Sequence, residues 1–110
     1  MSEYTPHDWV VLKIEGAGYK VFGGWRGGYL DGDSWRLNSG ITKVYETDTG
    51  MLVFEGYSGS RYVVHPDNYG IRGMYNTSVL EKLTAHDVVT VLSENTDWLT
   101  VDYGEYDDNT

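Results

Sequence analysis

The sequence contains no cysteine, so neither disulfide bonds nor thiolate metal sites can form. No apolar run approaches the roughly 20 residues that a membrane-spanning helix needs. The first six residues carry neither the basic stretch nor the apolar stretch of a secretory signal. We therefore expect a cytoplasmic protein that acts without a cofactor and without a membrane partner.

Basic residues are also scarce, since eight Lys and Arg stand against 17 Asp and Glu, for a net charge of −9. Residues 83–110 contain no Lys and no Arg, although they hold seven of the acids: Asp87, Glu94, Asp97, Asp102, Glu105, Asp107 and Asp108. A one-sided negative field repels nucleic acid and attracts basic surfaces. Direct binding to DNA or RNA is therefore disfavoured.

What the chain does have is ten Tyr, four Trp and short β-branched runs separated by Gly-rich turns. This composition favours half-buried strands. Strands are expected at 9–14, 19–22, 35–38, 41–46, 51–57, 61–65, 88–92 and 98–103. The fold class is therefore predicted to be mainly β with one short helix, as a small antiparallel barrel or sandwich of about six to eight strands. An α+β fold is the alternative.

A length of 110 residues predicts one domain, with residues 1–8 as a loose lead, 9–103 as a single β-rich domain and 104–110 as an acidic tail. The only helix signal is a capping box, with Ser78 as the N-cap and Glu81 three positions later. Asn76 is a competing cap. Leu80 and Leu83 are spaced to face a core.

The acidic end is the first candidate site. If residues 98–103 form an alternating strand, Leu99, Val101 and Tyr103 point inward and Trp98 points outward among carboxylates. An aromatic anchor with an acidic rim is suited to binding a basic protein surface. This hypothesis describes a non-enzymatic inhibitor or charge mimic of a nucleic-acid-handling protein, whose contact residues are Asp97, Trp98, Asp102, Glu105, Asp107 and Asp108.

The alternative is a small-ligand or glycan-binding module that uses the glycine-rich stretch 23–34. Five glycines in these twelve residues predict an irregular loop. Rings beside carboxylates can bind sugars, or a cation by cation–π attraction. The loop residues proposed for this role are Trp25, Tyr29, Asp31, Asp33 and Trp35.

Catalytic and metal sites have little support in the sequence. Three scattered histidines lack the spacing of a metal site, and no metal is expected. Asp31 and Asp33 resemble the start of a calcium loop, but Thr42 occupies the place of the required glutamate. A hydrolase that uses His65 and Asp67 ranks third, because no partner for the pair is evident.

Two stretches, Ser34–Ile41 and Gly56–Tyr62 with Tyr69-Gly70 beyond, resemble segments of small uncharacterised proteins of tailed bacteriophages. The similarity covers about the middle third of the chain and includes no catalytic motif. The resemblance implies a viral origin and an accessory role in infection, and it assigns no functional residue.

Overall fold

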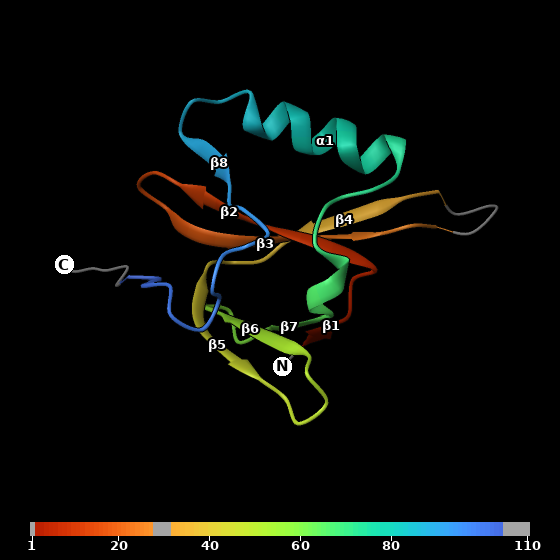
Figure 1. Cartoon of the computed structure of the whole chain (residues 1–110). Coiled ribbons are helices and arrows are strands. Elements are labelled where there is room, and N and C mark those ends of the chain that lie inside the picture. The colour runs from red at the N-terminus through yellow and green to blue at the C-terminus, as the bar shows by residue number, and fades with distance from the viewer. Residues whose placement is uncertain (1, 28–31, 105–110) are drawn as a thin grey trace.

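The computed structural model describes residues 2–27 and 32–104, and these form two four-stranded sheets and one α-helix (Figure 1). The outer sheet has the order β1-β7-β6-β5, and the central sheet has the order β4-β3-β2-β8. The elements are β1 (Glu3–Tyr4), β2 (Asp8–Ile14), β3 (Gly18–Trp25), β4 (Ser34–Leu37), β5 (Ile41–Glu46), β6 (Leu52–Gly56), β7 (Arg61–Val64), a 3-10 helix (Pro66–Asn68), α1 (Met74–Thr84) and β8 (Val89–Val91).

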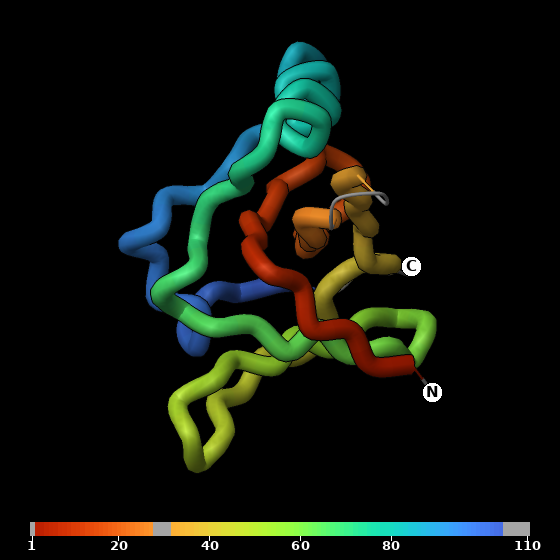
Figure 2. The backbone as a smooth tube through the Cα atoms, turned by 90° about the vertical axis from the view of Figure 1, so that its right-hand side faces the viewer, coloured from red at the N-terminus to blue at the C-terminus, as the bar shows by residue number. Residues whose placement is uncertain are grey.

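The prediction of a mainly β fold with one helix is confirmed, and the sheets form a sandwich. Helix α1, the central sheet and the outer sheet lie in three layers, which Figures 1 and 2 show from two directions. The strand pairs of the described chain are antiparallel except β1–β7, which is parallel. No helix in the described part of the chain is both long enough and apolar enough to cross a membrane.

Strand β2 is covered on both faces, and this explains its continuous apolar run. Trp9 and Val11 contact the core between the two sheets, whereas Val10 and Leu12 contact the second core beneath α1. All four side chains are nearly inaccessible to solvent. Complete burial of such a side chain stabilises the fold by roughly 1.5–3 kcal/mol.

The helix begins earlier than predicted, so the assignment of Ser78 as N-cap is wrong. Helix α1 starts at Met74 after Gly73, whose φ of 90° and lack of a side chain leave the first turn without a side-chain cap. Asn76 lies inside the helix and donates from Nδ2 to the Ser34 carbonyl at 2.8 Å. A tertiary contact to β4 therefore holds the first turn in place of the local capping box. Leu80 and Leu83 pack against the second core, as predicted.

The prediction of a loose lead over residues 1–8 is wrong for the described part of that stretch. Glu3 and Tyr4 form β1 and pair with Arg61 and Tyr62 of β7. Asp8 is fully buried at the start of β2. Backbone pairing to an existing strand holds this segment, although its sequence has no apolar run.

The prediction of an alternating strand at 98–103 is also wrong. This segment is irregular, and Asp97 fixes a turn because its Oδ1 accepts from the Leu99 amide at 3.2 Å. The Thr100 amide bonds to the Asp97 carbonyl at 3.1 Å. An aspartate that bonds to the backbone two residues ahead favours a turn over an extended strand. Trp98 and Leu99 are consequently exchanged relative to the prediction, since Trp98 is buried and Leu99 is exposed, whereas Tyr103 packs against the core and Asp102 is exposed as predicted.

Candidate functional site

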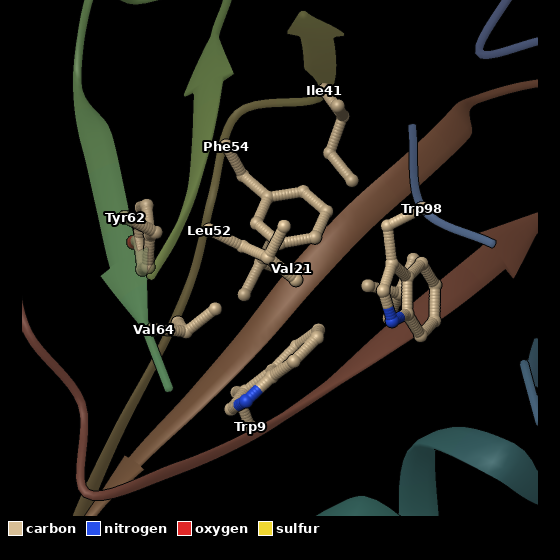
Figure 3. Close-up of a cluster of buried hydrophobic side chains, with 9 residues drawn as sticks. Trp9, Val21, Ile41, Leu52, Phe54, Tyr62, Val64 and Trp98 are labelled. Carbon is tan, nitrogen blue, oxygen red and sulfur yellow. The ribbon is translucent and has the colours of Figure 1, made fainter. Parts of the chain in front are cut away.

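Trp98 is a core residue, and this removes the aromatic anchor predicted for the acidic end. Only 8% of its surface is exposed, and its side chain lies in the buried cluster with Trp9 and Phe54 (Figure 3). Its ring centroid lies 5.3 Å from those of Trp9 and Tyr69. The Tyr103 hydroxyl donates to the Trp98 carbonyl at 2.7 Å. The side chain exposed here is that of Leu99, at 50%. The segment that follows β8 therefore adds its tryptophan to the core between the sheets.

The acids predicted to surround Trp98 have different positions in the structure. Asp97 and Asp102 are exposed, and each accepts a hydrogen bond from a backbone amide two residues ahead. Neither forms an ion pair with a residue that the structure describes. The remaining three predicted contacts, Glu105, Asp107 and Asp108, lie outside the described residues.

The glycine-rich stretch is less irregular than predicted, because β3 continues through Gly23 and Gly24 to Trp25. A Cβ on Gly23 would lie 2.9 Å from Pro6 Cγ, and one on Gly24 would lie 2.7 Å from Asp8 Oδ1. These glycines are therefore required by close packing within a strand. The prediction that they exclude a regular element is wrong at these two positions.

The predicted ligand loop does not bring its two tryptophan rings together, although both residues line one surface depression. Trp25 is paired with Ser34, and Trp35 is the next residue, so the two rings point to opposite faces of the sheet. The Trp35 ring stacks on Phe22 with centroids 5.3 Å apart. Asp33 is half-buried beside Gly73, and the other two members, Tyr29 and Asp31, lie outside the described residues.

A groove between β1 and the inner face of β3 and β4 gathers the side chains best placed to bind a ligand. It consists of two depressions of about 400 and 360 Å³ that share Tyr4 and Arg36. The first depression is also lined by Glu3, Thr5, Trp25, Ser34 and Trp35. The second is lined by Ser2, Leu37, Asn38, Ser39, Ser58, Ser60 and Tyr62. We call this surface the β1–β4 groove.

Rings hold Arg36 at the middle of the groove. Its guanidinium lies 4.5 Å from the Tyr4 ring centroid, and Tyr4 packs at 5.0 Å on Tyr62 and at 6.4 Å on Trp25. Burial raises the pKa of Tyr62 to about 12, and the nearby charge of Arg36 partly offsets that increase. A guanidinium next to a ring is attracted to the ring face and keeps several N–H donors for other partners.

Hydroxyl groups line the far end of the groove. Ser39 Oγ donates to Ser58 Oγ at 3.2 Å, and Ser58 Oγ lies 3.1 Å from Ser60 Oγ. The Ser58 amide donates to Ser39 Oγ at 2.9 Å. This end of the groove is therefore polar and connected by hydrogen bonds, whereas the other end is aromatic.

A second polar cluster lies on the opposite side of β3, under α1. Asp8 Oδ2 accepts from the Arg72 amide at 3.2 Å and lies 3.9 Å from Arg26 Nε. Desolvation is the largest influence on this carboxyl, and it raises the pKa of Asp8. Asn76 completes the cluster as a fully buried amide that joins α1 to β4. We interpret this cluster as the anchor of the helix.

The structure gives His65 and Asp67 a local role. His65 Nδ1 accepts from the Asp67 amide at 3.1 Å and thereby caps the 3-10 helix. Both side chains are largely exposed. Among the described residues there is no group of three or more His, Cys, Asp or Glu that could hold a metal ion.

Sequence reasoning missed Tyr4, Arg36, Asn38 and the serines of the groove. One signal for Arg36 was available in the sequence. Because side chains alternate along a strand, Arg36 points to the opposite face of β4 from Trp35 and Leu37. No comparable signal indicated that Tyr4 would lie opposite Arg36, because β1 was interpreted as part of a loose lead. Comparison with protein-family models, with curated proteins and with solved structures finds no match to the chain.

Proposed function

We propose that this protein is a non-enzymatic binding module, and that its β1–β4 groove receives a small ring-bearing ligand such as a sugar unit. The observation that carries the proposal is the position of Tyr4, Trp25 and Arg36 along one open groove. The faces of aromatic rings pack against the apolar C–H surface of a sugar, and polar groups at the edge fix its orientation.

The dimensions of the groove suit such a ligand. Each depression falls within or near the lower part of the 300–1,000 Å³ range that is typical of small-molecule sites. The first depression supplies rings and the second supplies serine hydroxyls. A ligand with one apolar face and several hydroxyl groups would satisfy both.

Isothermal titration with a panel of monosaccharides and nucleosides tests this proposal. The expected result is a saturable signal that is weakened in Trp25→Ala and in Tyr4→Ala. Tyr75→Ala is the matched control, because Tyr75 is an exposed tyrosine on α1 outside the groove. Thermal melting checks that each variant is folded. Absence of binding by the folded wild-type protein, or equal loss in Tyr75→Ala, would contradict the proposal.

A second function is favoured by the charge of the C-terminal segment. In the described part of residues 83–110, the acids Asp87, Glu94, Asp97 and Asp102 are all exposed, and this stretch has no Lys or Arg. Leu99 supplies the exposed apolar contact that Trp98 cannot supply. We propose that this surface engages a basic protein that handles nucleic acid. The resemblance to phage proteins makes a host protein the candidate partner.

Salt and charge variants test the second function. Capture of a basic partner from lysate should weaken steeply as salt rises, because screening acts on exposed charges. Asp97→Asn combined with Asp102→Asn should reduce capture, because it removes two negative charges. The fold should be kept, since each amide oxygen can still accept the turn hydrogen bond. Glu46→Gln combined with Asp48→Asn removes the same charge elsewhere and should leave capture intact. Equal effects of the two pairs would exclude a specific surface.

A further inference from the structure

The second depression of the β1–β4 groove has a charge opposite to that of the whole protein. The chain carries a net charge of −9, yet the described lining of this depression contains Arg36 and no carboxylate. Lys20 adds a second positive group at this end, because its Nζ donates to the Ser39 carbonyl at 3.3 Å. A local positive field in an acidic protein selects for negative ligands.

Arg36 has no carboxylate partner within the described residues. The ion pairs found there join Arg26 to Asp8, Arg61 to Glu3 and His65 to Asp67. The guanidinium of Arg36 instead lies over Tyr4. A guanidinium that carries no carboxylate partner can form a bidentate bond through its N–H donors to an incoming oxyanion.

A buried donor at the base of this depression also lacks a partner. Asn38 is 3% exposed, and its Oδ1 accepts from the amides of Val21 and Gly40 at 3.0 and 3.2 Å. These two bonds fix the amide orientation and leave Nδ2 as the donor. Asn38 Nδ2 finds no acceptor among the described residues. A buried donor without an acceptor costs about 1–3 kcal/mol, so an incoming acceptor there is favoured.

The serine hydroxyls add a further donor near Asn38. A Cβ on Gly56 would lie 2.8 Å from Ser39 Oγ and 3.2 Å from Asn38 Nδ2, which places these two groups beside the same position. The hydroxyls of Ser39, Ser58 and Ser60 are joined by two hydrogen bonds. The three hydroxyls have three protons, and two of these are used in the two hydrogen bonds. One proton, that of Ser58 or of Ser60, therefore stays available to donate, whichever of the two donates in the second bond.

We infer that the ligand of the β1–β4 groove carries an oxyanion on its ring, as a uronic acid does. Its carboxylate binds among Arg36, Asn38 Nδ2 and the serine hydroxyls, while the sugar ring lies toward Trp25. This inference rests on the proposed function, since it names the chemical class of the ligand for the same groove. The donors of the second depression recognise the charge, and the rings of the first depression recognise the sugar.

Titration of the full chain with glucuronic acid, glucose and sodium acetate, in parallel, tests the inference. Glucuronic acid is expected to bind at least ten-fold more tightly than either glucose or acetate. Raising the salt concentration should weaken binding of glucuronic acid and leave binding of glucose unchanged.

Two groups of variants separate the two parts of the groove. Arg36→Gln and Asn38→Asp should remove the preference for glucuronic acid over glucose, because each takes away a donor, and Asn38→Asp also adds a negative charge. Trp25→Ala should weaken both sugars by a similar factor and keep the preference. Arg36→Gln alone is sufficient if Asn38→Asp does not fold.

The outcomes distinguish this inference from the proposed function. Equal affinity for glucuronic acid and glucose would overturn the inference and leave the proposed function standing. Acetate that binds as tightly as glucuronic acid would show a site for free carboxylate only, and this would also overturn the inference. Binding of neither sugar by the folded protein would overturn both.

Discussion

Two clusters of aromatic rings in this protein differ in how completely other parts of the chain cover them. The closed cluster contains Trp9, Phe54, Tyr69 and Trp98, whose ring centroids lie 4.7–6.1 Å apart where they contact. The open cluster consists of the half-buried rings of Tyr4 and Trp25, 6.4 Å apart, and Tyr4 packs at 5.0 Å on the buried ring of Tyr62. The spacing of the rings is therefore similar in the two.

What differs is the chain that passes over each cluster. The segment after β8 contributes Trp98 to the closed cluster, and the Tyr103 hydroxyl secures the Trp98 carbonyl. The open cluster lines the β1–β4 groove. A fully covered group of rings stabilises the fold, whereas the partly covered group keeps apolar surface at the place where we propose that a ligand binds.

The largest expected effect is that of Trp98→Ala in the closed cluster. Removal of a buried tryptophan leaves a cavity and should lower the free energy of unfolding by about 3–5 kcal/mol. Urea denaturation measures this change. Leu99→Ala is the neighbouring control, and its effect should be about 0.5 kcal/mol because Leu99 is half exposed. Equal effects of the two variants would place Trp98 outside the core.

The hydroxyl of Tyr69 should be the next most important group. It donates to the Leu92 carbonyl at 2.7 Å and accepts from the Val11 amide at 3.1 Å. Tyr69→Phe leaves these backbone groups unpaired and should lower the free energy of unfolding by about 1–3 kcal/mol. Tyr75→Phe, at an exposed position, serves as the control.

The pH dependence of the same variant provides a second test. Burial raises the pKa of Tyr69 to about 12 in the folded protein. The neutral phenol is therefore favoured by folding, and its contribution is complete below the ordinary pKa of 10 and is lost as pH rises toward 12. Tyr69→Phe should lose less stability than the wild-type protein between pH 10 and 12. An equal loss would contradict the assigned burial.

Asp8 lies next to the open cluster, on the far side of β3, and should have a smaller effect. Because desolvation raises the pKa of Asp8, the folded state binds its proton more tightly than the unfolded state. The contribution of Asp8 to stability is then complete below its ordinary pKa of 3.8 and decreases as pH rises above that value.

Asp8→Asn keeps the shape of the side chain and removes the titration. The stability of the variant relative to the wild-type protein should therefore increase from pH 4 to pH 7.5, as measured by thermal melting. Glu46→Gln controls for the loss of one negative charge at an exposed position. A relative stability that falls with pH would show that the arginines near Asp8 outweigh desolvation.

Arg36→Gln in the open cluster should have the smallest effect on stability. A cation over an exposed ring contributes about 0.5–1 kcal/mol, so the denaturation midpoint should change little. Loss of ligand discrimination without loss of stability would sharpen the contrast between the clusters. A loss as large as that of Trp98→Ala would identify Arg36 as a structural residue.

The sequence predicted most strands correctly because their β-branched runs act locally. The expected strand at 41–46 matches β5, and the runs at 9–14 and 61–65 differ from β2 and β7 by one residue. The spacing of Leu80 and Leu83 placed the helix correctly, but the predicted first residue of the helix was wrong. Asn76 joins α1 to a carbonyl of β4, a partner 42 residues away that a local pattern cannot show.

The candidate site was less accessible to sequence reasoning. Trp25 was identified, but its ring neighbour Tyr4 comes from β1, and Tyr4 packs in turn on Tyr62 of β7, which is distant in the chain. Trp98 was placed outside because alternation was assumed, but the turn at Asp97 buries Trp98 and exposes Leu99. Both errors arise because exposure depends on which segment covers a side chain.

The sequence by itself determined the composition of the core strands, the turns that separate them and the concentration of acids after residue 82. These properties follow from local backbone preference and from residue type. The tertiary structure alone decided which rings are covered and brought Tyr4, Ser58 and Ser60 beside Arg36 and Asn38. The reason is that burial and charge recognition depend on contacts between residues far apart in the chain.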